Sequence, residues 1–187
     1  MELRTIGVIG AGQMGGGIAH VCALSGFDVR LLDLEESRLV EAMEKIERDM
    51  HRQAARGKVG DADVAAALAR ITTSTDYGIF GDCDLVVEAA TEDESIKREI
   101  LKTLVPHLSP AAIIATNTSS ISITRLAAVT DRPGRFIGMH FMNPVPAMQL
   151  VELIRGIATE QDTFEAVEAL ALALGKTVSV AEDFPAF

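Results

Sequence analysis

The chain opens with TIGVIGAGQMGGGIAH, residues Thr5 to His20. An apolar run typical of a buried strand leads directly into Gly10, Gly12 and Gly15, and a helical pattern follows at once. In this order the first glycine makes a tight turn, the second lets the backbone approach a pyrophosphate, and the third lets helix and strand pack closely. Free N–H groups at the helix start would face the phosphates. The stretch therefore predicts a dinucleotide-binding turn.

An acidic residue follows where such a turn requires one. A second apolar run ends in Asp33, about twenty residues beyond the turn, where a carboxylate can accept both hydroxyls of the adenosine ribose. The same carboxylate would repel the 2′-phosphate of NADP, and the next residue is Leu34 rather than Arg. NAD is therefore the expected cofactor. The alternative is a glycine-rich turn of another α/β protein, in which Asp33 merely ends a strand.

Strands and helices alternate along the whole chain. Strands are predicted at 3–10, 27–33, 71–74, 84–90, 111–116, 136–140, 148–154 and 177–180, and helices at 14–25, 35–56, 61–69, 94–107, 122–128 and 161–174. The alternation predicts an α/β fold of the Rossmann type, a doubly wound and mostly parallel sheet with helices on both faces, as one domain over residues 1–187. Ligands of such sheets bind outside the carboxyl ends of the strands.

Composition excludes several classes of partner. The net charge of −10 argues against nucleic acid and anionic membranes, and every apolar run is too short to cross a bilayer. No metal site is predicted. Cys22 and Cys83 are expected to be reduced core residues, and Met1 is followed almost at once by the first strand, which leaves no room for a leader. These features predict a cytoplasmic protein.

One helix carries a local excess of positive charge. Four cations recur at intervals of three and four: Lys45, Arg48, Arg52 and Arg56. This spacing places them along one side of the helix, where an anionic ligand could dock. Alternatively the face is solvated, and the neighbouring acids Glu41, Glu44, Glu47 and Asp49 simply pair with the cations.

A candidate for proton transfer closes the strand at 136–140. His140 stands in GMHFMNPVP, residues 138–146, where the two prolines rigidify the following turn. Histidine titrates near neutrality, so it can accept the proton of a secondary alcohol while hydride leaves the carbon. Glu152, on the next strand, could hold the other ring nitrogen and fix its orientation. The alternative is a structural histidine beside an ordinary exposed glutamate.

Four motifs, in this order and spacing, resemble the NAD-binding domain of the 3-hydroxyacyl-CoA dehydrogenases, in particular the bacterial 3-hydroxybutyryl-CoA dehydrogenases. They are GAGQMG at 10–15, LVVEAATE at 85–92, TNTSS at 116–120 and HFMNPVP at 140–146. The resemblance covers essentially the whole chain. It implies an NAD-dependent interconversion of (S)-3-hydroxyacyl-CoA and 3-oxoacyl-CoA, with short chains such as 3-hydroxybutyryl-CoA and acetoacetyl-CoA, in fatty acid or butanoate metabolism.

The resemblance also implies roles for single residues. His140 is the implied catalytic base, Glu152 its orienting partner, and Ser119 a contact of both the cofactor and the substrate's 3-oxygen. The implied cofactor contacts are Gly10, Gly12, Gln13, Met14, Gly15, Asp33, Glu92, Lys97, Ser119 and Asn143. The basic helix matches the region that receives coenzyme A, so Arg52 and Arg56 join Ser119 as candidate substrate contacts. Met142 stands where the family usually has Phe, an apolar exchange that leaves the proton chemistry intact.

The end of the sequence departs from the resemblance. Family members continue as a helical domain that closes over the acyl chain, supplies an active-site asparagine and forms most of the dimer interface, whereas this sequence stops at DFPAF, residues 183–187. The chain is therefore expected to be the cofactor-binding half, impaired in catalysis alone, with a homodimer expected for the full-length member. Phe184 and Phe187 are expected to be exposed apolar surface that pairs with another copy.

Two other functions remain open. One is a sugar-acid dehydrogenase built on the same domain, against which the basic helix and the Asn-Pro-Val-Pro loop favour a coenzyme A thioester. The other is a non-catalytic NAD-binding module that senses redox state or acts through a partner. The missing second domain favours this module, whereas the combination of His140, Glu152 and Ser119 argues against it.

Overall fold

A single sheet organises the computed structural model, which describes residues 2–183, and its eight strands run in the order β3-β2-β1-β4-β5-β6-β7-β8. Their bounds are β1 Thr5–Ile9, β2 Asp28–Leu32, β3 Ile71–Ser74, β4 Leu85–Glu88, β5 Ile113–Thr116, β6 Phe136–Phe141, β7 Leu150–Arg155 and β8 Thr177–Glu182. All neighbouring pairs are parallel except β6 and β7, which are antiparallel. The strand order reverses at β1 and β4, which is where doubly wound sheets bind their ligands.

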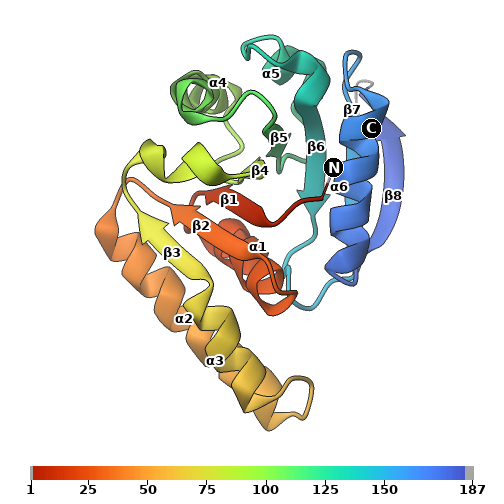
Figure 1. The fold of residues 1–187 in the computed structure, drawn as a ribbon. Coiled ribbons are helices and arrows are strands. Elements are labelled where there is room, and N and C mark those ends of the chain that lie inside the picture. Colours follow the sequence, from red (N-terminus) through yellow and green to blue (C-terminus); the bar gives the residue numbers. More distant parts are fainter. Residues whose placement is uncertain (1, 184–187) are drawn as a thin grey trace.

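Helices cover both faces of the sheet, as predicted (Figure 1). They are α1 Gln13–Leu24, α2 Glu36–Ala55, α3 Asp61–Ala69, α4 Glu94–Leu104, α5 Ile123–Ala127 and α6 Gln161–Ala173. One apolar core joins α1, α2, α3 and α6 to the sheet, and a second core joins α4 and α5 to the other face. The predicted Rossmann-type architecture is confirmed.

Burial along the strands follows from this layering. Every residue of β4 and β5 is buried, because helices cover both faces of these central strands. The edge strand β8 is largely exposed and extends to Glu182, two residues beyond its predicted end. The predicted helix at 94–107 divides at Leu104, and a 3₁₀ turn at Val105–His107 follows with Pro106 inside it. A second 3₁₀ helix, Tyr77–Asp82, was not predicted.

The long helix α2 lies beside α3, and their joined end extends beyond the sheet (Figure 1). Its buried residues are Leu39, Ala42, Ile46 and Met50, which recur at helical spacing and face the core. The opposite side of α2 is charged. Beside the buried stripe, Lys45, Arg52 and Arg56 line the same pocket as Gly12 of the glycine turn.

Candidate functional site

The glycine turn connects β1 to α1 with the geometry that its sequence predicts. Gly10 has a φ of +97°, a left-handed conformation that favours glycine. A Cβ at Gly15 would stand 1.7 Å from the Gly10 carbonyl oxygen, so only glycine allows α1 to start so close to β1. A Cβ at Gly12 would meet no atom within 4 Å, and no side chain caps the start of α1. The space above Gly12 and the uncapped N–H groups fit a pyrophosphate.

Asp33 lies directly beside this turn. Its carboxylate accepts a hydrogen bond from the Ala11 N–H at 2.8 Å and a longer one from the Glu35 N–H at 3.3 Å. The residue is largely buried, with 9% of its surface exposed. A carboxylate has more lone pairs than these two donors occupy. Asp33 can therefore still accept a ribose hydroxyl at the end of β2.

Glu92 joins the loops that follow β4 and β5. Its Oε1 accepts hydrogen bonds from the Thr118 hydroxyl at 2.6 Å, from the Ser119 N–H at 2.8 Å and from the Ser119 hydroxyl at 3.1 Å. Partial burial opposes ionisation, but the hydrogen bonds from Thr118 and Ser119 outweigh it and lower the pKa of Glu92. Two residues predicted to meet the cofactor, Glu92 and Ser119, are thus in contact.

Lys97 lies beneath these loops rather than on their surface. Its ammonium is completely buried and donates to Glu88 Oε2 at 2.5 Å and to the Asn117 carbonyl oxygen at 3.3 Å. The Thr116 hydroxyl donates to the same Glu88 oxygen at 2.7 Å. In this conformation Lys97 reaches the sheet edge only through the Asn117 carbonyl. Its direct contact with a cofactor stays a prediction.

His140 and Glu152 face each other across the antiparallel strands β6 and β7. The His140 Nδ1 lies 2.8 Å from Glu152 Oε2. Because a carboxylate only accepts, this contact favours the tautomer that carries its proton on Nδ1 and leaves a lone pair on Nε2. The His140 side chain is 19% exposed, so a substrate can reach it. The predicted pairing of these two residues is confirmed.

The loop at 142–149 connects these two strands. The Asn143–Pro144 peptide bond is cis, and the Gln13 side-chain amide donates to Asn143 Oδ1 at 2.9 Å. Val145 packs on α1, where a Cβ at Gly17 would stand 2.9 Å from the Val145 Cβ. The predicted cofactor contacts Gln13 and Asn143, which are 130 residues apart in sequence, are therefore brought together. The Met14 side chain, by contrast, packs against the apolar core.

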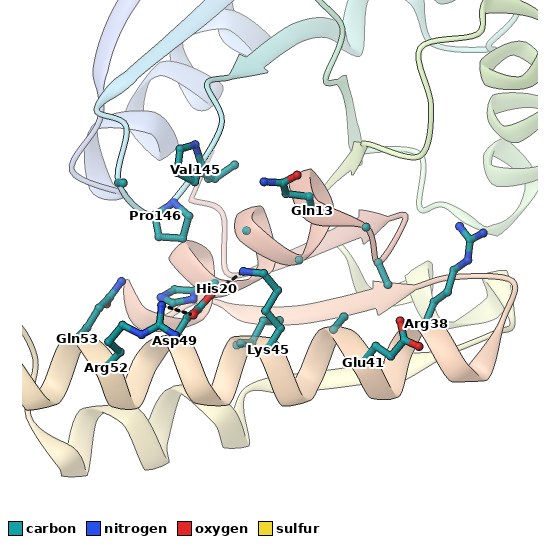
Figure 2. A pocket seen from close by; sticks show the side chains of 18 of the residues that line it. Gln13, His20, Arg38, Glu41, Lys45, Asp49, Arg52, Gln53, Val145 and Pro146 are labelled. Atoms are coloured by element: carbon teal, nitrogen blue, oxygen red, sulfur yellow. Dashed lines mark hydrogen bonds and ion pairs between the residues drawn. The ribbon is translucent and has the colours of Figure 1, made fainter.

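A pocket of about 770 Å³ lies between α1, α2 and this loop (Figure 2). Its charged or ionisable lining residues are His20, Arg38, Glu41, Lys45, Asp49, Arg52 and Arg56. Val145 and Pro146 stand on the side of the pocket opposite α2 (Figure 2). The predicted contacts Arg52 and Arg56 therefore line one cavity, whereas Arg48 is exposed outside it.

The alternative prediction, that acidic side chains of α2 pair with its cations, is confirmed for part of the helix. Asp49 lies 2.6 Å from the Lys45 ammonium and 3.3 Å from the Arg52 guanidinium, so it partly neutralises both cations. Sequence reasoning missed His20 and Arg38 as lining residues. The spacing of Arg38 from Lys45 is seven residues, two turns of the same helix face, and this periodicity could have included it.

A metal-binding cluster and a membrane-spanning helix are both absent from the described residues 2–183. These residues contain no group of three or more His, Cys, Asp or Glu side chains that could hold a metal ion. No helix among them has both the length and the apolar character needed to cross a membrane.

The family is decided by comparison with known proteins. A family model described as "3-hydroxyacyl-CoA dehydrogenase, NAD binding domain" matches residues 5–184. The chain belongs to the 3-hydroxyacyl-CoA dehydrogenase family. The resemblance carried by the four sequence motifs is thus confirmed, and the glycine turn and Asp33 belong to a domain whose family is described as NAD-binding.

Individual members of this family are similar over the whole chain. A 3-hydroxybutyryl-CoA dehydrogenase of Bradyrhizobium diazoefficiens is 56% identical over 185 residues, which are 99% of this chain and 63% of that protein. A probable 3-hydroxybutyryl-CoA dehydrogenase of Bacillus subtilis is 45% identical over all of this chain and 65% of its own length. The crystal structure of (S)-3-hydroxybutyryl-CoA dehydrogenase PaaH1 from Ralstonia eutropha matches with a TM-score of 0.97 and 47% identity, over 100% of this chain and 66% of that one. The chain spans less than two thirds of the length of these curated relatives.

Proposed function

We propose that this chain is the NAD-binding part of an (S)-3-hydroxyacyl-CoA dehydrogenase that interconverts 3-hydroxybutyryl-CoA and acetoacetyl-CoA. The observation that carries the proposal is the 2.8 Å contact between His140 and Glu152 at the sheet edge that also holds the glycine turn and Ser119. A cofactor site alone would need no such pair. The names of the relatives support the substrate.

NAD is the proposed cofactor, held by the glycine turn and Asp33. The uncapped start of α1 offers N–H groups to the pyrophosphate, and the Asp33 carboxylate suits a free 2′-hydroxyl but repels a 2′-phosphate. On the nicotinamide side, Asn143 and the Glu92–Ser119 pair lie at the ends of β6, β4 and β5. Bound NAD supplies a hydride acceptor for C3 of the substrate.

The proton of the substrate hydroxyl is proposed to pass to His140 Nε2. Glu152 holds Nδ1–H, which fixes the ring and stabilises the imidazolium that forms when Nε2 accepts the proton. The Ser119 hydroxyl, held by Glu92 on one side, still has lone pairs and a rotatable proton with which to meet the 3-oxygen. In the reverse direction His140 returns the proton to the reduced carbonyl oxygen.

Coenzyme A is proposed to occupy the pocket between α1 and α2. Its phosphates match the cations that line the pocket, which the loop after His140 also borders. Arg56 forms no ion pair within residues 2–183, so it can contact a phosphate without giving up a partner, whereas Arg52 shares Asp49 with Lys45. This arrangement favours a thioester over a free sugar acid.

We extend the proposal to how the chain works in the cell. The sheet edge with His140 and Ser119 is accessible, and hydride transfer is favoured where water is excluded. Residues 1–187 are therefore proposed to bind NAD well and to turn over substrate slowly without further cover.

Two buried, free cysteines support a cytoplasmic location. The homodimer rests on the resemblance alone, and Phe184 and Phe187 lie outside the described residues.

The cofactor half of the proposal is tested by titrating NADH and NADPH into the protein by calorimetry. We expect one NADH per chain and an NADPH affinity at least about tenfold lower, because Asp33 repels the additional phosphate. Asp33→Asn should weaken NADH binding and remove the preference, whereas the matched change Asp28→Asn at the exposed start of β2 should do neither. Equal affinities for both cofactors in the unchanged protein would contradict the proposal.

The catalytic half is tested by following NADH oxidation with acetoacetyl-CoA at high protein concentration. His140→Gln should slow the reaction by about 10² to 10⁴-fold, the usual contribution of a general acid or base, with NADH affinity within twofold of the unchanged protein. His107→Gln, an exposed histidine, is the control. Reduction of NAD by a free 3-hydroxy acid or sugar acid, without activity on the thioester, would favour the second dehydrogenase. NADH binding with no activity on either substrate would favour the non-catalytic module.

A further inference from the structure

A buried lysine outside the predicted site reaches the loop at 142–149. Lys176 follows α6, directly after Gly175, whose φ of +71° turns the chain toward β8. Its ammonium donates to the Val145 carbonyl oxygen at 2.6 Å and to the Met148 carbonyl oxygen at 2.8 Å. Only 8% of the residue is exposed. One side chain from a distant element thus holds two points of the loop.

The loop needs donors from outside because of its own sequence. Pro144 and Pro146 have no N–H groups, and the nearby Ala147 and Met148 N–H groups both donate to the Pro144 carbonyl at 3.0 Å. Buried carbonyl groups without a donor are costly. The Lys176 ammonium supplies the missing donors at the turn between β6 and β7.

Packing alone does not account for a lysine at this position. Burial lowers the pKa of Lys176, which reports the cost of removing an ammonium from water, and no carboxylate lies within ion-pair distance of it in residues 2–183. A methionine would fill the same space without this cost. The charge is therefore retained for the two carbonyl groups that it holds.

The loop held in this way serves both proposed ligands. Asn143 accepts from Gln13 beside the glycine turn, and two residues further along the loop Val145 packs on Gly17 and lines the pocket. We infer that Lys176 is a positioning residue: by binding the Val145 and Met148 carbonyls it fixes the loop in the geometry that cofactor and coenzyme A both require. This inference rests on the proposed function for its ligands, but not for the loop geometry itself.

The test compares Lys176→Met with the unchanged protein in two measurements. Hydrogen exchange followed by mass spectrometry reports the opening of the segment 142–149, and calorimetry reports the affinities for NADH and for coenzyme A. We expect exchange in the segment to accelerate at least about tenfold, with β1 and β4 unchanged, and both affinities to fall about tenfold through lost preorganisation. Lys102→Met, an exposed lysine of α4, should change neither measurement.

Lys176→Arg keeps the charge and carries the test if the methionine variant does not fold. The bulkier, planar guanidinium directs its N–H groups differently from the ammonium, so exchange in the segment should rise to a level between the unchanged protein and Lys176→Met, with the thermal midpoint preserved. Exchange in the segment and both affinities within twofold of the unchanged protein, in whichever of the two variants folds, would overturn the inference. If the unchanged protein binds no NADH but the Lys176 variant still exchanges faster in the segment, the proposed function is refuted. The role of Lys176 in holding the loop is then still supported.

Discussion

The His20 ring is 1% exposed on α1, and its Nε2 has no hydrogen-bond partner among residues 2–183. Burial is the largest influence and lowers its pKa. Gln53 and Asp49 oppose this shift, whereas Lys45 and Lys176 add to it. The side chain is therefore neutral in the folded protein at neutral pH, and in mildly acidic medium it binds fewer protons in the folded protein than in the unfolded chain.

This residue makes a pH dependence of stability testable. A base whose pKa is depressed by folding contributes stability that is complete above its unfolded pKa of about 6.5 and is lost as the pH falls through its folded pKa. Urea unfolding at pH 7.5 and at pH 5.5 should therefore show a smaller loss for His20→Gln than for the unchanged protein. His107→Gln, at an exposed position, should keep the full loss. Equal losses in all three proteins would exclude His20 as a source.

The sequence predicted the position of a candidate site residue only where that position depends on the residue's own backbone or on its place at the end of a strand. Gly10, Gly15 and His140 fall in this class, because a left-handed turn, a close approach and a strand end are local properties. Lys97 and Lys176 do not. A lysine reads as exposed from sequence, and its burial depends on partners that other elements bring to it.

Between elements, the buried pair of Glu88 and Lys97 links β4 to α4 below the site. Both side chains are completely buried, so neither charge can be solvated if its partner is removed. Glu88 Oε1 also accepts from the Ala90 N–H at 2.9 Å, which ties the pair to the loop after β4. The pair therefore holds α4 in one position relative to the sheet.

Lys97→Met is expected to lower the free energy of unfolding by about 3–5 kcal/mol, because it leaves the Glu88 carboxylate buried without a counter-charge. Lys102→Met breaks an exposed pair with Glu99 on the same helix and should cost at most about 1 kcal/mol. The double change Glu88→Gln with Lys97→Met should recover part of the loss. Urea unfolding at pH 7 measures all three, and equal effects of Lys97→Met and Lys102→Met would contradict the account.

The hydrophobic pattern of a strand does not predict whether β7 runs parallel or antiparallel to β6. Periodicity predicted strands at 136–140 and 148–154 and a mostly parallel sheet, which is confirmed, but it left their relative direction open. The short connection at 142–149 carries the information, because parallel neighbours need a crossover of about a dozen residues or more. The antiparallel turn brings Glu152 opposite His140.

Across the whole molecule, the proposed cofactor site joins the two apolar cores. The glycine turn belongs to the face covered by α1 and α2, and the Glu92 and Ser119 loops border the face covered by α4 and α5. A ligand that spans the sheet edge binds only when both halves are folded together. Its binding energy therefore adds to the stability of the entire fold.

NADH at about one hundred times its dissociation constant is expected to add about 2.7 kcal/mol to the free energy of unfolding. For a chain of this size this corresponds to a rise of about 5–10 °C in the thermal midpoint. NADPH at the same concentration should raise the midpoint less, because we propose that Asp33 repels its 2′-phosphate. A calorimetric scan with each cofactor makes the comparison, and an NADH-independent midpoint would contradict it.

The antiparallel pairing of β6 and β7 makes the His140–Glu152 pair a local structure. The two residues are 12 apart in sequence and meet as soon as one hairpin closes, without waiting for a long-range crossover. Their alignment depends on the hairpin register alone, because a slip of one residue would turn Glu152 to the other face of the sheet. Length changes within 142–149 can therefore leave the pair aligned, whereas a single insertion inside either strand would separate it.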